Sequence, residues 1–302
     1  ADGLVEEGIR VMFHVDADDG SQVSVGHPAT FVNWQTPSAP THCVSGRWDI
    51  AIVDSYRADE PTIGTIANNS EKTAFFDDDN RLPYPKGFLI NGSPGAHGVG
   101  YPKSAAVCNL LGAQYQVLRK EFWGATPVEV APRVVNTLIT FGGSGLDERV
   151  AQYVDVISHR FPDIHHHVVS PDSRVTTGSN VSVYGRLSAA EMIGLMNRCD
   201  LAVSGGGQTL AELAVLGIPV VCVGVAENQR HNIEGWRIGN TLDFAGWLDE
   251  ADTLERTTAL IEGNMGYAVR KEKSLNGQSL IDGRGARRIV QALLGETNGQ
   301  LP

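Results

Sequence analysis

Residues Ser204 to Asn232 read SGGGQTLAELAVLGIPVVCVGVAENQRHN. The apolar run just before them, Leu201 to Val203, predicts a short buried strand, and the three glycines predict a tight turn into a helix. That helix is expected from Gln208 to Leu216, with Gly217 as the left-handed residue after its end. Val220 to Val225 predicts the next buried strand. A strand, a glycine turn, a helix and a second strand indicate a parallel α/β sheet.

The glycine turn also predicts an anion-binding site, because free backbone amides and the dipole of a helix favour negative charge at the helix start. Glu212 is expected one turn inside the helix, on the same face as Gln208 and Thr209, and a carboxylate suits sugar hydroxyls better than phosphate. The alternative is a purely structural turn, since such glycine motifs are weak indicators without context. We therefore expect the phosphates and ribose of a nucleotide to bind at Ser204, Gly205, Gly206, Gly207, Gln208, Thr209 and Glu212.

Composition and charge argue against several classes of protein. The 302 residues are enough for two domains, and the net charge of −11 argues against a nucleic-acid partner. No apolar run approaches the roughly 20 residues that span a bilayer. The four cysteines form no CxxC pair, so we expect a reduced, cytoplasmic protein without structural zinc.

The first residues, ADGLVEEGIRVMFHV, have the pattern of the last turns of a helix followed by a strand at Ile9–Phe13. Parallel α/β domains normally open with a strand, and their first glycine loop follows it. We therefore expect that an initial strand and loop lie outside this sequence, together with any catalytic residue that the loop carries.

Alternating strands and helices predict two doubly wound, Rossmann-like domains, at residues 1–126 and 133–302, joined by a proline-containing linker. The first domain is expected to be incomplete at its start. In the second domain, a helix is predicted from Asp147 to Arg160, and SAAE at Ser188–Glu191 predicts a capping box. Further strands are expected at Asp49–Val53, Thr73–Phe76, Phe88–Ile90, Val134–Phe141, His166–Val169, Val181–Tyr184 and Thr241–Phe244. Ligands of such sheets bind at the carboxyl ends of the strands, which places the expected site in a cleft between the domains.

Polar residues follow two strands of the first domain at their carboxyl ends. Asp54 and Tyr56 follow one strand, and the run Asp77, Asp78, Asp79 and Asn80 follows another. One interpretation is a capped turn with solvated acids, because Asp and Asn favour turns. The other is catalysis: adjacent carboxylates repel one another, so one of them can have a raised pKa and act as a base. A divalent cation is a weaker alternative.

Two further groups have structural explanations beside functional ones. Arg119, within LRKEF, either forms an ion-pair surface near the linker or contacts the substrate. His165–His167 lie on or beside a strand whose side chains alternate between faces, so three neighbours do not readily share one metal ion. We expect a structural or solvated role for these histidines.

Seven stretches, in order along the chain, resemble one family. They are WDIAIVDSY (from Trp48), FFDDDNRLPYP (from Phe75), INGSPGA (from Ile90), LLGAQYQVLRKEFW (from Leu110), ITFGGSG (from Ile139), SGGGQTLAELAVLG (from Ser204) and ENQRHNIEGW (from Glu227). The family comprises the UDP-sugar hydrolases of pseudaminic acid biosynthesis and the related spore-coat polysaccharide proteins.

The resemblance implies a GT-B fold whose second domain holds UDP, with the pyrophosphate on the SGGGQT turn and the ribose on Glu212. It also implies that Gly142, Gly143 and Ser144 lie beside the nucleotide, and that Asn228 and Gln229 face the sugar or the diphosphate. The family opens with a GxGHxxR loop whose histidine is essential. That loop is absent from this sequence, and His27 in VGHPAT follows a different strand.

The resemblance thus implies a nucleotide-sugar hydrolase in which water attacks the anomeric carbon of a UDP-linked acetamido sugar, without a metal or other cofactor. Catalysis is expected to involve Asp54, Tyr56, Asp77, Asp78 and Asn80. A glycosyltransferase of the same fold and a non-catalytic subunit that binds nucleotide sugars remain alternatives, because one fold hosts several chemistries.

Overall fold

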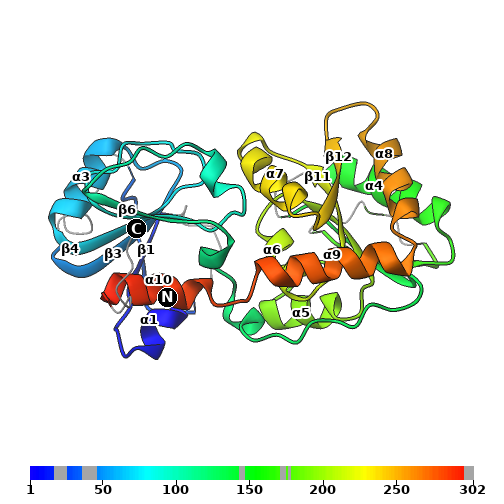
Figure 1. The fold of residues 1–302 in the computed structure, drawn as a ribbon, viewed down its shortest axis with the longest axis horizontal. Helices are drawn as coiled ribbons and strands as arrows, with labels where there is room; N and C mark the ends of the chain where they lie inside the picture. The colour runs from blue at the N-terminus through cyan, green and yellow to red at the C-terminus, as the bar shows by residue number, and fades with distance from the viewer. Residues whose placement is uncertain (17–25, 36–45, 143–146, 171–174, 176–177, 296–302) are drawn as a thin grey trace. The chain divides into compact units, whose positions relative to one another are not determined.

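The computed structural model describes residues 1–16, 26–35, 46–142, 147–170, 175 and 178–295. The chain divides into two compact units (Figure 1). Unit 1 contains Ala1–Gly92, Ala96–Tyr115 and the segment from Gly285 onward, and unit 2 contains Ser93–Gly95 and Gln116–Arg284.

Unit 2 is built on a six-stranded sheet in which every neighbouring pair of strands is parallel. From one edge to the other, the strands are β12 (Leu242–Trp247), β11 (Val220–Gly224), β10 (Leu201–Gly205), β7 (Asn136–Thr140), β8 (His165–Val169) and β9 (Val181–Tyr184). The chain winds outward from β7 to β9 in one direction and from β10 to β12 in the other. The predicted doubly wound sheet is therefore confirmed.

Helices complete the core of unit 2. They are α4 (Asp147–Arg160), α5 (Ala189–Met196), α6 (Thr209–Val215), α7 (Arg230–Ile238), α8 (Thr253–Gly263) and α9 (Tyr267–Leu280), with short 3-10 turns η3 (Lys120–Phe122) and η4 (Glu227–Gln229). Residues of α4 and α8 pack in one cluster with fully buried strand residues such as Ile139, Val203 and Val221. On α5, the capping box is confirmed: Ser188 Oγ accepts from the Glu191 amide, and the Glu191 carboxylate accepts from the Ser188 amide.

Unit 1 contains a four-stranded parallel sheet with strands in the order β3 (Trp48–Asp54), β4 (Ser70–Phe76), β5 (Gly87–Asn91) and β6 (Val107–Leu111). Helix α3 (Glu60–Asn68) connects β3 to β4, and Asp59 caps it by accepting from the Thr62 amide at 2.9 Å. A second sheet pairs β1 (Phe13–Val15) with β2 (Ala29–Phe31). The remaining elements are α1 (Asp2–Glu6), α10 (Gly285–Leu294) and the 3-10 turns η1 (Ala96–Gly98) and η2 (Ala113–Tyr115).

Three features of unit 1 differ from the sequence-based expectations. The strand expected at Ile9–Phe13 begins only at Phe13, because its partner β2 pairs with Phe13, His14 and Val15 alone. Helix α10, which lies in the range expected for the second domain (133–302), groups with unit 1. Its Leu293 is fully buried, Leu293 O accepts from Lys72 Nζ at 2.6 Å, and Arg287 forms an ion pair with Glu6 at 3.3 Å. Residues Gln116–Thr126, which were expected in the first domain, belong to unit 2. The first domain was expected to end at residue 126, whereas this part of unit 1 ends 11 residues earlier, at Tyr115.

Candidate functional site

Glycines lie at the carboxyl ends of two neighbouring strands at the centre of the unit 2 sheet. Gly142 follows β7 with a φ of +84°, and Gly205 closes β10 on the neighbouring strand. A Cβ on Gly205 would lie 3.2 Å from the carbonyl oxygen of Phe141, so the two strand ends approach closely. The chain reverses its winding direction between β7 and β10. This position, at the carboxyl ends of the strands, is where doubly wound sheets bind their ligands.

Gly206 is held in place by residues that follow β11. A Cβ on Gly206 would lie 2.4 Å from Ile233 Cδ1, which only glycine avoids. Gln229 Oε1 accepts from the amides of Gly206 (3.2 Å) and Val225 (3.1 Å), and Asn232 Nδ2 donates to Gly206 O at 2.8 Å. The oxygen of Gln229 therefore has two backbone partners inside unit 2, whereas the neighbouring Asn228 is exposed on η4.

The start of α6 leaves three backbone amides without a partner. The first turn closes with bonds from Leu210 N to Gly207 O and from Ala211 N to Gln208 O, and no side chain caps the helix. The N–H groups of Gly207, Gln208 and Thr209 consequently make no hydrogen bond within the described part of the chain. Unsatisfied amides at a helix start are suited to an anion.

Glu212 is 4% exposed and pairs with Arg119 through two hydrogen bonds. Arg119 Nε donates to Glu212 Oε1 at 2.7 Å, and Nη2 donates to Oε2 at 3.0 Å. Gln208, one turn earlier on α6, contacts the same segment: its amide group bonds to Gln116 at 2.9 Å and to Val117 O. Residues of the segment 116–119 thus contact both Gln208 and Glu212.

In unit 1, Asp77 closes a turn. Its carboxylate accepts from the amides of Asp79 and Arg81, each at 2.9 Å, and from the hydroxyl of Tyr84 at 2.8 Å. Asn80 lies inside this turn with a φ of +52°. Both residues therefore have a structural explanation, which the sequence analysis kept open beside a catalytic one.

The carboxyl group of Asp78 has fewer hydrogen-bond partners than that of Asp77. Tyr56 donates to Asp78 Oδ2 at 2.7 Å, while Asp78 Oδ1 is buried and has no partner among the described residues. Burial raises the pKa of Asp78, and the charges of Asp77 and Asp79 raise it further. The hydrogen bond from Tyr56 acts in the opposite direction and lowers this pKa. Partial desolvation also raises the pKa of Asp54, an exposed residue at the end of β3, with a further contribution from the charge of Asp78. Two carboxyl groups with raised pKa values thus follow adjacent strands.

The three consecutive histidines are part of the unit 2 sheet. The rings of His165 and His167 lie on one face with centroids 4.8 Å apart, and they bond to Ser182, Tyr184 and Asn136. His166 bonds to Thr137 and to Phe161 O. Within the described residues, no group of three or more His, Cys, Asp or Glu side chains is arranged to hold a metal ion.

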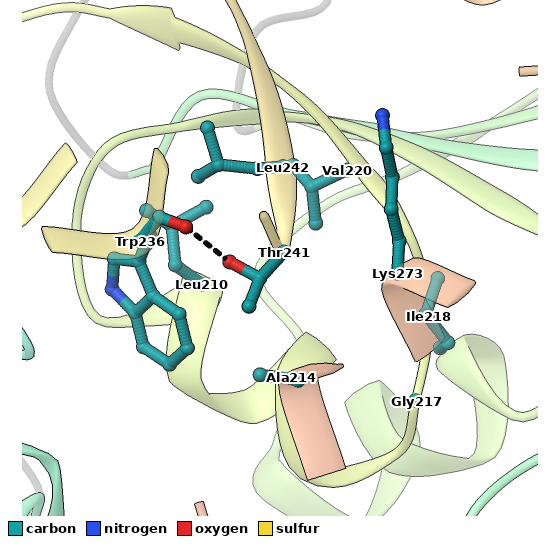
Figure 2. A pocket seen from close by; sticks show the side chains of 10 residues that line it. Leu210, Ala214, Gly217, Ile218, Val220, Trp236, Thr241, Leu242 and Lys273 are labelled. Atoms are coloured by element: carbon teal, nitrogen blue, oxygen red, sulfur yellow. Dashed lines mark hydrogen bonds between the residues drawn. The ribbon is translucent and has the colours of Figure 1, made fainter. Parts of the chain in front are cut away.

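A small cavity lies at the other end of α6 (Figure 2). Thr241 Oγ1 donates to Trp236 O at 2.8 Å beside it, and the side chain of Lys273 lies along its wall and forms an ion pair with Asp243. None of the glycine-turn residues lines this cavity, so it is a gap in the core packing and not part of the predicted site. Its lining consists of Leu210, Ala214, Gly217, Ile218, Val220, Trp236, Thr241, Leu242, Lys273 and Gly277.

Comparisons with known proteins found similarity to one curated protein by sequence and to solved structures by fold. No protein-family model matches the chain. One curated relative, the pseudaminic acid cytidylyltransferase and UDP-2,4-diacetamido-2,4,6-trideoxy-β-L-altropyranose hydrolase of Helicobacter pylori, is 27% identical over 197 residues. That match covers 60% of this chain, which spans about a third (35%) of the relative's length.

Solved structures match over much more of the chain. The MurG structure from Acinetobacter baumannii has a TM-score of 0.62 at 11% identity and covers 97% of this chain and 93% of that one. The UDP-GlcNAc 2-epimerase from Neisseria meningitidis, solved with UDP-GlcNAc bound, has a TM-score of 0.54 at 15% identity, with coverages of 82% and 76%.

The chain has the GT-B fold.

The structure brings some of the residues expected to bind the nucleotide together, and others lie outside the described residues. Gly142 and residues Ser204–Thr209 come together at the ends of β7 and β10. Gly143 and Ser144 lie outside the described residues. Sequence reasoning did not find the hydrogen bonds of Gln229 to the turn, which depend on a residue 23 positions from Gly206. No helix in the described ranges is long and apolar enough to cross a membrane.

Proposed function

We propose that this protein is a nucleotide-sugar hydrolase that releases UDP from a UDP-linked acetamido sugar. The observation that carries the proposal is the close approach of Gly142 and the Gly205–Gly207 turn at the centre of the unit 2 sheet, beside three amides that have no partner among the described residues. The curated relative has a UDP-sugar hydrolase in its name, and an epimerase of the same fold was solved with UDP-GlcNAc bound. Both support a UDP-sugar as the substrate.

In this proposal the diphosphate accepts hydrogen bonds from the amides of Gly207, Gln208 and Thr209. Gly142, Gly143 and Ser144 lie beside the nucleotide, and Ser204 to Gly206 shape the turn. Donors that are already oriented toward the diphosphate stabilise the charge that develops on it as the sugar departs. Such donors supply the charge stabilisation that a metal ion gives in other enzymes.

For the chemical step we propose Asp78 as the general base. Water attacks the anomeric carbon, its proton passes to the Asp78 carboxylate, and the bond between that carbon and the diphosphate oxygen breaks as UDP leaves. A raised pKa brings a carboxylate closer to the pKa of an effective base near neutral pH. Tyr56 orients Asp78 through its hydrogen bond, and Asp54 contributes to the same acidic environment. Asp77 and Asn80 hold the turn that presents Asp78.

A glycosyltransferase is the second candidate, because solved structures of glycosyltransferases share this fold. The two reactions differ in whether water or another hydroxyl group attacks the anomeric carbon. Release of UDP from the UDP-sugar in the absence of any acceptor would favour the hydrolase. Turnover that appears only when an acceptor alcohol is added would favour the transferase.

The experiment begins with calorimetric titration of UDP, with ADP, CMP and NAD as controls, followed by a UDP-release assay on UDP-linked acetamido sugars. Selective UDP binding and acceptor-independent release are the expected results. Binding of all four nucleotides with similar affinity, or of none of them by a folded sample, would contradict the assignment to UDP-sugar chemistry.

A further inference from the structure

The hydroxyl group of Tyr101 contacts the backbone immediately before Asp78. Tyr101 lies between η1 and β6, and its hydroxyl donates a hydrogen bond to Asp77 O. That oxygen belongs to the peptide group that joins Asp77 to Asp78. Because a peptide group is planar, a donor that holds its oxygen also sets the direction of the Asp78 N–H, and with it the point from which the Asp78 side chain starts. Tyr101 therefore acts on the orientation of Asp78 through the backbone.

Asn91, at the carboxyl end of β5, fixes the direction of this contact. Asn91 is 4% exposed, and its Nδ2 donates to the hydroxyl oxygen of Tyr101 at 2.9 Å. A backbone carbonyl can only accept, so the single proton of the hydroxyl points to Asp77 O, and Asn91 must present its NH₂ group to Tyr101. Asn91, Tyr101 and Asp77 O thus form a series of two hydrogen bonds with one possible direction.

Tyr101 keeps this proton while carboxyl groups titrate. Burial raises the pKa of Tyr101, and the charges of Asp77 and Asp78 raise it further, against hydrogen bonds from Asn91 and from the backbone of Asn80. A phenol titrates at about pH 10 in water, so a phenol with a raised pKa remains a donor in neutral and acidic solution. Tyr101 therefore remains a donor to Asp77 O in both protonation states of Asp78.

A second tyrosine contacts Asp77 in a different way. Tyr84 donates to Asp77 Oδ2, and the carboxylate of Asp77 also accepts from the amides of Asp79 and Arg81. This carboxylate would keep two backbone donors without the Tyr84 hydroxyl. Asp77 O, by contrast, accepts from Tyr101 and from no other donor among the described residues. The orientation of the peptide group consequently depends more strongly on Tyr101 than on Tyr84.

We propose that Tyr101 and Asn91 are positioning residues for Asp78, which act through the peptide group between Asp77 and Asp78. The inference rests on the proposed function, in which Asp78 accepts the proton of the attacking water. Asp78 Oδ2 accepts from Tyr56 at 2.7 Å, and this contact requires the peptide group to keep its orientation. Without the Tyr101 hydroxyl, the peptide group rotates and the carboxyl group of Asp78 moves away from Tyr56.

The test first reads the position of Asp78 without relying on activity. In protein labelled with ¹³C at its aspartate carboxyl groups, an NMR titration gives the pKa of Asp78, whose signal is assigned by its loss in Asp78→Asn. The variants are Tyr101→Phe and Asn91→Ala, and thermal melts establish that each is folded. Tyr84→Phe is the matched control, because it removes the same hydroxyl group from the carboxylate of Asp77 instead of the carbonyl. Steady-state UDP release and calorimetric UDP binding are measured on the same samples.

We expect Tyr101→Phe to raise the pKa of Asp78 as far as Tyr56→Phe does, because the hydrogen bond from Tyr56 lowers this pKa and is lost in both variants. Its kcat should fall about tenfold, while KM and UDP affinity stay within about twofold, since a misplaced group loses orientation and not substrate binding. Asn91→Ala should have a smaller effect in the same direction, because the Tyr101 hydroxyl still donates. Tyr84→Phe should move the pKa of Asp78 less than Tyr101→Phe does.

A double variant separates positioning from a general effect on the protein. In Tyr101→Phe/Asp78→Asn, kcat should be no lower than in Asp78→Asn alone, because a residue that acts through Asp78 has nothing left to position. A further loss of about tenfold in the double variant would show that Tyr101 acts independently of Asp78 and would overturn the inference.

The remaining outcomes distinguish this inference from the proposed function. An unchanged Asp78 pKa in folded Tyr101→Phe, or an equal change in Tyr84→Phe, would overturn the inference whatever the activity. If the pKa moves as expected but Asp78→Asn releases UDP as fast as the wild type, the positioning of Asp78 stands and its role as the base fails. If the wild type releases no UDP, the proposed function fails and the titration still decides the inference.

Discussion

The carboxyl ends of the two sheets carry opposite kinds of polar group. In unit 2, the strand ends lead to glycine turns and unpaired N–H groups, and the buried acid Glu212 is paired with Arg119. In unit 1, the strand ends lead to Asp54 and Asp78, whose pKa values are raised and which have no cationic partner among the described residues. One unit offers donors to an anion, and the other offers groups that can accept a proton.

This contrast separates binding from chemistry. Donors on a rigid backbone keep their geometry and do not titrate, so they suit a diphosphate that stays bound through the reaction. Carboxyl groups that burial makes harder to ionise suit a proton that must be transferred. A change in unit 2 should therefore alter nucleotide affinity, and a change at Asp78 should alter turnover.

The largest expected effect is on turnover. Asp78→Asn removes the proposed base while its amide retains the size of the side chain, so kcat for UDP release should fall by about 100-fold or more. UDP affinity measured by calorimetry should stay within about twofold. Asp79→Asn is the matched control, since Asp79 is an exposed acid in the same turn and should keep most of the activity. Equal losses in the two variants would place the base elsewhere.

The next effect concerns the glycine turn. Gly206→Ala puts a Cβ 2.4 Å from Ile233 Cδ1 and 2.9 Å from Gln229 Oε1, so the turn must shift. Overpacking of this kind costs about 1–3 kcal/mol, and we expect lower stability together with weaker UDP binding. Gly207→Ala is the control, because its Cβ would meet only Gln229 Nε2, at 3.8 Å. Chemical denaturation and calorimetry on both variants measure the difference. Similar behaviour of the two variants would contradict the described packing of the turn.

A third experiment uses acid to test whether the buried histidines of unit 2 are neutral in the folded protein. Burial lowers the pKa of His166, and burial with the charges of His165 and Arg198 lowers that of His167 to about 4. The unfolded chain therefore binds more protons, and stability present above about pH 6.5 should be lost as the pH falls toward 4.

His167→Gln should reduce this loss by on the order of 2 kcal/mol, measured from urea midpoints at pH 7 and 4.5. A wild-type urea midpoint that does not fall between pH 7 and pH 4.5 would show that these histidines are not held neutral.

The smallest effect is a displacement of a pH profile. The hydrogen bond from Tyr56 lowers the pKa of Asp78. Tyr56→Phe removes this bond, so the pKa of Asp78 should rise and the acid limb of kcat/KM should move to higher pH. The expected displacement is a fraction of a unit to about one unit, as for the loss of one hydrogen bond to a carboxylate. A displacement in the opposite direction would argue against Asp78 as the base.

Local rules predicted the parts of the fold that depend on neighbouring residues. The bounds of α4, the capping box of α5 and the left-handed Gly217 (φ +72°) were all predicted from short stretches. Helix α3 is not predicted by local rules, because its sequence EPTIGTIAN contains proline, glycine and two threonines, all weak helix formers. Its helical state follows from packing, since Ile63 and Ala67 are buried in the unit 1 core.

For the candidate site, too, local features could be predicted from the sequence and long-range contacts could not. A glycine turn between a strand and a helix is visible in the sequence, but the partners of its side chains are not. Arg119 and Glu212 are separated by 93 positions, and no local pattern indicates that they pair. Asp77 and Asp78 are adjacent and chemically alike, and only the path of the backbone turns one into a structural cap and leaves the other with an oxygen unpaired.

The central claim is that a nucleotide diphosphate binds the free amides at the start of α6. A titration of ¹⁵N-labelled protein with UDP, followed by amide chemical shifts, tests it directly. The account predicts that the largest shifts belong to Gly207, Gln208 and Thr209, with smaller shifts at Gly142 on the neighbouring strand end. Saturable UDP binding that leaves these amides unmoved, and shifts other residues instead, would contradict it.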